Sequence, residues 1–171
     1  MRTKGIYLLL ILALALTACG NKVVEDPIAL LDQEKNQVTF PQEKPTLFFF
    51  ITTYTWTHCQ KQLVELHKNL NKLADLDVNM YIISSDTPEQ QSDLYDAIER
   101  NFGQSLPFIS DPDLEMIDSF GMKNGDHAYR GYGLLDEKGN VLFHTIDDNW
   151  GEQFDKTVSK IKEEYEQYKK D

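Results

Sequence analysis

Two long apolar runs, separated by a helical pattern, constrain the fold of this chain more than any other feature. "TLFFFITT", residues 46–53, and "VNMYIISSD", residues 78–86, have the length of strands and are apolar without alternation. Such continuity is typical of strands that are buried on both faces of a sheet. Between the runs, leucines recur at helical spacing: Leu63, Leu66, Leu70 and Leu73. Strand, helix and strand in this order predict a βαβ unit in a covered parallel sheet.

The segment after the second run predicts another helix. "TPEQQSDLYDAIERNFG" places Thr87 as a cap, Pro88 at the first helical position and Gly103 as the stop. A short strand and a short helix capped by Asp111 are expected next, in "LPFISDPDLEMIDSFGM". Their order continues the α/β alternation.

The last third of the chain predicts a hairpin and a closing helix. Residues 128–147 contain two apolar strands joined by "DEKGN", in which Gly139 can take the positive φ of such a turn. From about Gly151 the apolar residues again follow a helical stripe. A βαβ unit, an inserted helix, a hairpin and a C-terminal helix occur in the order of the thioredoxin-like fold.

The N-terminal residues have the layout of a secretory signal. "MRTKGIYLLLILALALTACGNK" has a positively charged start, an apolar run too short for a comfortable membrane span, and small residues before Cys19. "LTAC" resembles the bacterial lipobox, which implies cleavage before Cys19 and a lipid on its sulfur. We therefore expect a signal peptide at 1–18, a lipidated N-terminus with a short tether at 19–36, and a thioredoxin-like domain at 37–171.

The anchor and the charge together limit the partners. More than one acyl chain on Cys19 would hold the protein stably on a membrane, so we expect it at the cell membrane, on the extracytoplasmic face. The formal net charge of the chain is −11. Because an acidic domain cannot bind nucleic acid by neutralising phosphates, no nucleic-acid partner is expected.

Cys59 is the one cysteine that remains once Cys19 carries a lipid. Outside the cytoplasm paired cysteines normally form disulfides, so a single cysteine indicates a reactive thiol or an intermolecular partner. A buried, inert cysteine is the alternative. The helical pattern places Cys59 in a first turn, four residues before Leu63, at the carboxyl edge of the sheet, where backbone N–H groups favour the thiolate.

A family resemblance adds a specific reaction. "DSFGMKNGDHAYRGYGLLDEKGNVLFHTIDD", "ISSD" and "FISDPD" resemble segments of the peroxiredoxins of the alkyl hydroperoxide reductase and thiol-specific antioxidant family. The resemblance extends over roughly residues 37–165 and implies a thioredoxin-like fold with Cys59 as the peroxidatic cysteine. It also implies that Arg130 orients the peroxide and stabilises the thiolate.

The chain departs from this family in the loop before Cys59. The family motif is P-x-x-x-T-x-x-C, whereas Thr52 holds the proline position here and Trp56 the threonine position. Thr55 or Thr57 would then supply the hydroxyl. Three further side chains are expected to form the pocket wall: Tyr54, Trp56 and His58.

These observations favour a membrane-anchored, thiol-dependent oxidoreductase, a one-cysteine peroxiredoxin-like peroxidase with an altered loop. A peroxide or an oxidised thiol would be its substrate, and an external thiol would reduce the oxidised Cys59, because one thiol cannot resolve its own oxidation. No metal or organic cofactor is implied. The sequence leaves a homodimer open.

Two other function classes compete with this interpretation. In a non-catalytic thioredoxin-like binding module, Tyr54 and Trp56 would form a docking surface. In a Sco-like copper protein, "THCQKQL" and "GDH" would supply Cys59 and His127, although Leu63 replaces the second cysteine. Exchange within a W-C-x-x-C dithiol is excluded, because the first cysteine position holds Trp56.

Overall fold

The computed structural model describes residues 22–55 and 57–170. The predicted signal peptide, the lipidation site Cys19 and the pocket residue Trp56 therefore lie outside the described residues. Within the described ranges, no helix is both long and apolar enough to cross a membrane.

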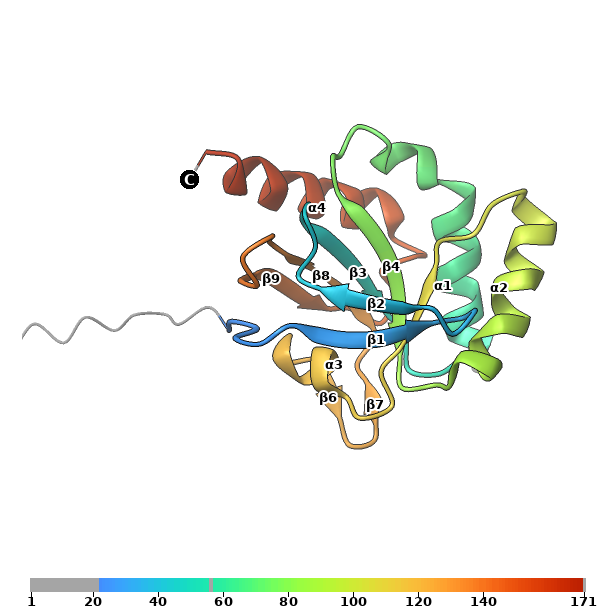
Figure 1. Ribbon diagram of the computed structural model, residues 1–171. Coiled ribbons are helices and arrows are strands. Elements are labelled where there is room, and N and C mark those ends of the chain that lie inside the picture. The colour runs from blue at the N-terminus through green and yellow to red at the C-terminus, as the bar shows by residue number, and fades with distance from the viewer. Residues whose placement is uncertain (1–21, 56, 171) are drawn as a thin grey trace, which may run out of the picture.

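The described part of the chain forms a seven-stranded sheet and a separate two-stranded ribbon (Figure 1). The order in the large sheet is β2-β1-β5-β4-β3-β8-β9, and the ribbon is β6-β7. The strands are β1 (Ile28–Asp32), β2 (Gln37–Phe40), β3 (Thr46–Phe50), β4 (Asn79–Ser84), β5 (Phe108–Ser110), β6 (Lys123–Asn124), β7 (His127–Ala128), β8 (Gly131–Leu135) and β9 (Val141–Ile146).

Helices cover both faces of the large sheet. They are α1 (Thr57–Lys68), the 3-10 helix η1 (Leu70–Leu73), α2 (Pro88–Phe102), α3 (Glu115–Ser119) and α4 (Phe154–Tyr168). Alternate residues of β3 divide the core: Leu47 and Phe49 pack in the cluster that contains α1 and α4 residues, and Phe48 and Phe50 pack in the cluster that contains α3 residues. All five residues of β3 are buried, as its unbroken apolar run predicts.

The predicted α/β order is confirmed. β3, β4 and β5 pair in parallel, and the β8–β9 hairpin adds to the other side of β3. Phe50 at the end of β3 lies beside Ile83 of β4 and Gly131 of β8. This register brings the loop after β3, the loop after β4 and Arg130 to the same edge of the sheet.

The ordered domain begins earlier than the predicted boundary at residue 37. β1 lies inside the range 19–36 and pairs antiparallel with β2 and β5. Its short apolar run "IALL" was not recognised as a strand in the sequence, and in the structure only Leu30 of it is buried. Further upstream, the N–H of Val24 donates to the carbonyl of Gly139 at 2.8 Å.

Three predicted helix ends also differ from the structure. The helix predicted from about His58 to Leu76 ends at Lys68, and the separate short helix η1 follows it. The last helix begins at Phe154 rather than near Gly151. Asp111 is not the terminal cap of α3, but its carboxylate accepts the N–H groups of Glu115 and Ile117, each at 2.9 Å, and so satisfies backbone donors at the start of that helix.

Candidate active site

Cys59 is the third residue of α1 and points into the core, as predicted. Its side chain is 0% exposed and belongs to the cluster that includes Phe49, Leu63 and Trp150. It is a free cysteine. The first turn of a helix offers backbone N–H groups and the positive end of the dipole. Because Cys59 is fully buried, a reagent can reach its sulfur only when the surrounding residues move.

The carboxylate of Asp86 holds the loop between β3 and α1. Its Oδ1 accepts the hydroxyl of Thr53 at 2.8 Å, and its Oδ2 accepts the N–H of Tyr54 at 2.8 Å and the hydroxyl of Ser84 at 2.9 Å. Asp86 is only 8% exposed. This carboxylate was not among the predicted site residues, although "ISSD" resembled a family segment, because the sequence does not show which loop it meets.

Arg130 lies next to this loop because β8 pairs with β3. Its Nη1 donates to the hydroxyl oxygen of Thr52 at 3.4 Å, and its Nη2 lies 2.6 Å from Oδ1 of Asp148. The Arg130 side chain is 15% exposed and that of Asp148 is 63% exposed. The positive charge predicted for the site is thus present at the sheet edge, but a carboxylate that the sequence analysis missed already neutralises it.

A small cavity opens beside this ion pair. Its volume is about 210 Å³. Its lining residues are Thr52, Asn124, Ala128, Tyr129, Arg130 and Asp148. Cys59 does not line it, so the sulfur and the cavity are separated in this conformation.

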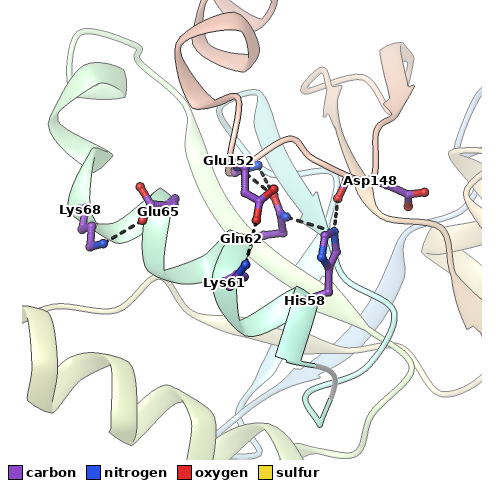
Figure 2. A network of polar contacts seen from close by, with 8 residues as sticks. His58, Lys61, Gln62, Glu65, Lys68, Asp148 and Glu152 are labelled. Atoms are coloured by element: carbon purple, nitrogen blue, oxygen red, sulfur yellow. Dashed lines mark hydrogen bonds and ion pairs between the residues drawn. The ribbon is translucent and has the colours of Figure 1, made fainter.

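Residues 147–153, which we call the strap, connect β9 to α4 and lie against the start of α1. Figure 2 shows His58 pointing at the main chain of Asp148, with 2.7 Å between its Nε2 and the carbonyl oxygen. A carbonyl only accepts, so a hydrogen bond to Asp148 requires a proton on Nε2 of His58. The amide nitrogen of Gln62 lies 3.3 Å from the same Nε2 and cannot donate to it in that tautomer. Gln62 is buried, and its Oε1 accepts the N–H groups of Gly151 and Glu152. These contacts tie α1 to a segment about 90 positions away.

The other predicted site residues divide into two groups. Tyr54 and His58 are half-buried at the loop and at the strap. Thr55 and Thr57 are exposed, and the hydroxyl that contacts Arg130 belongs to Thr52. The role of Thr55 or Thr57 in binding a peroxide stays a prediction.

Two other histidines bear on the alternative functions. His67 is buried: its Nδ1 donates to the carbonyl of Leu63 at 2.7 Å and its Nε2 accepts the N–H of Leu106 at 3.1 Å. Burial lowers the pKa of His67. His127 is half-exposed on β7, whereas Cys59 is in the core. Among the described residues, no group of three or more His, Cys, Asp or Glu side chains is placed to hold a metal ion.

Comparison with known proteins identifies a family. The model of the AhpC/TSA family matches residues 22–144. No curated protein matches the chain.

Solved structures of peroxiredoxins share the fold. Peroxidoxin BcpB from Mycobacterium tuberculosis is 19% identical, with a TM-score of 0.64, over 78% of this chain and 90% of that one. AhpC from Enterococcus faecalis is 19% identical, with a TM-score of 0.65, over 84% and 93%. The reduced 2-Cys peroxiredoxin of Plasmodium vivax is 16% identical, with a TM-score of 0.67, over 84% and 94%. At such identities the likeness concerns the fold alone.

Proposed function

The chain belongs to the AhpC/TSA family, and from this premise we propose that it is a thiol-dependent peroxidase with Cys59 as its nucleophile. One observation carries the proposal. The only cysteine among the described residues lies in the first turn of α1, at the same sheet edge as the largely buried guanidinium of Arg130.

The proposed reaction has one covalent step on the protein. The Cys59 thiolate attacks one oxygen of a hydroperoxide, the S–O bond forms and the O–O bond breaks. Sulfur is oxidised to a sulfenic acid, and the departing alkoxide or hydroxide takes a proton to leave as alcohol or water. Arg130 with Thr52 offers donors to the peroxide oxygens.

Regeneration needs two equivalents of an external thiol, because Cys59 has no second cysteine in the described residues. The first thiol attacks the sulfenic sulfur, forms a mixed disulfide and releases water. The second attacks the mixed disulfide and restores the Cys59 thiol. This makes the protein a one-cysteine member of its family.

We also propose that Cys19 carries a lipid that holds the protein on the extracytoplasmic face of the cell membrane. The support is the sequence "LTAC" after a charged and apolar start. Metabolic labelling with an alkyne fatty acid tests it: label and membrane association should be lost together in Cys19→Ser. Labelling that persists in this variant would contradict the anchor.

Stopped-flow mixing of the reduced protein with hydrogen peroxide, followed by Trp fluorescence, tests the peroxidase proposal. We expect a rate far above that of a free thiol, absent in Cys59→Ser and at least about tenfold lower in Arg130→Ala, since a charged donor contributes roughly 1.5–3 kcal/mol. Dimedone trapping and mass spectrometry should place the sulfenic acid on Cys59. A rate no faster than that of a free thiol would contradict the proposal.

The second candidate function is a thioredoxin-like binding module without catalysis. The complete burial of Cys59 favours it, because a nucleophile must meet its substrate. The same stopped-flow experiment separates the two functions: a binding module should react slowly, with equal rates in the wild type and in Arg130→Ala.

A further inference from the structure

The guanidinium of Arg130 already has an anionic partner. Its Nη2 lies 2.6 Å from the Asp148 carboxylate, and its Nη1 faces the hydroxyl of Thr52 at 3.4 Å. A second anion could pair with this guanidinium only by displacing Asp148 or by lying close to it. Either arrangement brings two negative charges together beside Arg130, which is only 15% exposed, while water still reaches the Asp148 carboxylate, which is 63% exposed.

The Asp148 carboxylate is held in place although its side chain is largely exposed. The N–H of Asp147 donates to the carbonyl of Arg130 at 3.0 Å, and the carbonyl of Asp148 accepts from His58 at 2.7 Å. Gln62 fixes the strap further along, where its Oε1 accepts the N–H groups of Gly151 and Glu152. Exposed ion pairs are usually weak because two mobile side chains must be ordered. Here the backbone on both sides of the Asp148 carboxylate is already fixed, so less conformational freedom is lost when the pair with Arg130 forms.

The cavity beside this pair is small and is lined by one positively and one negatively charged side chain. Arg130 and Asp148 are its charged lining residues, and the others are neutral: Thr52, Asn124, Ala128 and Tyr129. Its volume of about 210 Å³ lies below the roughly 300–1,000 Å³ of ordinary ligand sites. It therefore fits a molecule of a few heavy atoms, and the Asp148 charge faces whatever enters.

We propose that Asp148 determines the charge preference of the site: by neutralising Arg130 it makes the site accept small uncharged hydroperoxides and disfavour anionic oxidants. This inference rests on the proposed function, because it concerns the oxidant that Arg130 would align. The net charge of −11 acts in the same direction by repelling anions at longer range.

Iodoacetamide and iodoacetate test this preference without any peroxide. Both alkylate the Cys59 thiolate with release of iodide, and they are similar in size but differ by one charge. The ratio of the amide rate to the acetate rate should fall about three- to tenfold in Asp148→Asn, because removal of the carboxylate leaves the positive charge of Arg130 available to the acetate. Asp148→Glu should restore the wild-type ratio.

Glu152→Gln is the matched control, since it removes one negative charge from the same strap at a side chain that pairs with Lys61 rather than Arg130. Its ratio should stay at the wild-type value. An unchanged ratio in Asp148→Asn would overturn the inference. An equal fall in Glu152→Gln would also overturn it, because net charge rather than the Arg130 pair would then explain the effect.

A titration with acetate, followed by the amide NMR signals of Tyr129 and Arg130, gives a second measurement that needs no access to Cys59. Acetate should shift these signals at about three- to tenfold lower concentration in Asp148→Asn than in the wild type. Equal affinities would overturn the inference. If the peroxide reaction fails while both anion experiments succeed, the proposed function fails and the charge preference of the site stands.

Discussion

The starts of α1 and α2 are held in opposite ways. At α2, Thr87 and Gln90 form a capping box, Pro88 occupies the first turn, and Gly103 ends the helix at φ 72°. At α1, side chains of the first two turns bond to the strap, 89 and 90 positions away: His58 to Asp148, and Gln62 to Gly151 and Glu152.

This difference separates a helix specified by its neighbours in the sequence from one placed by the tertiary structure. The ends of α2 follow from residues within a few positions. The position of α1, and with it the thiol of Cys59, also depends on the loop after β4 and on the strap. Four substitutions, in α1, in α2 and in the segments that contact α1, test this contrast.

The largest effect is expected from Gly151→Ala in the strap. A Cβ at Gly151 would lie 2.5 Å from the Cα and the carbonyl oxygen of Gln62, so α1 and the strap must move apart. We expect a loss of roughly 3 kcal/mol in the free energy of unfolding, measured by urea denaturation, and faster alkylation of Cys59. Gly103→Ala is the matched control: among the described residues, no heavy atom other than those of its chain neighbours lies within 4 Å of a Cβ at this position. Its positive φ should cost only about 1 kcal/mol, without a change in alkylation.

Asp86→Ala should have the next largest effect. It leaves the Thr53 hydroxyl, the Tyr54 N–H and the Ser84 hydroxyl without this acceptor. We expect a loss of about 2–3 kcal/mol in the free energy of unfolding and faster hydrogen exchange of the Tyr54 amide. Thr53→Val should cost less, since it removes one of the three bonds. Unchanged exchange at Tyr54 would contradict the role of Asp86 in holding this loop.

A smaller effect is expected from Thr87→Ala at the start of α2. It removes the capping box, which typically costs about 1 kcal/mol, and urea denaturation measures this loss. The rate of Cys59 alkylation should stay at the wild-type value, because the cap acts within α2. A rate that changes as much as in Gly151→Ala would remove the contrast between the two helices.

The smallest effect concerns pH and the far end of α1. Burial lowers the pKa of His67 in the folded state below its ordinary value of 6.5, so between the two values the unfolded chain binds more protons. The contribution of His67 to stability is thus complete above about pH 6.5 and is lost as the pH falls through the folded-state value. Urea denaturation between about pH 5 and 7.5 should show a smaller slope for His67→Gln. An identical slope would contradict this assignment.

The features of the fold that were predicted correctly are those that local sequence patterns determine. The continuous apolar run of β3, the capped α2 and the hairpin turn at Gly139, with φ 87°, were all placed correctly. Cys59 and Arg130 were chosen from helical spacing and family resemblance, and strand pairing brings Arg130 to the sheet edge where the loop that leads to α1 begins. Local patterns could not reveal the partners of these residues. A carboxylate such as Asp86 or Asp148 resembles any other acidic residue until the register of distant strands decides which group it meets.

Residues 22–24 are attached to the hairpin turn, and this attachment would orient the domain at a bilayer. The carbonyl of Lys22 accepts the N–H of Val141, next to the turn 136–140. If Cys19 is lipidated as proposed, covalent geometry keeps Lys22 within about 11 Å of the lipid attachment. β8 spans about 16 Å from this turn to Arg130. The turn would therefore face the headgroups, and the thiol edge would face away from the bilayer. Oxidants and reducing thiols would then reach the protein from the aqueous side rather than from within the lipid.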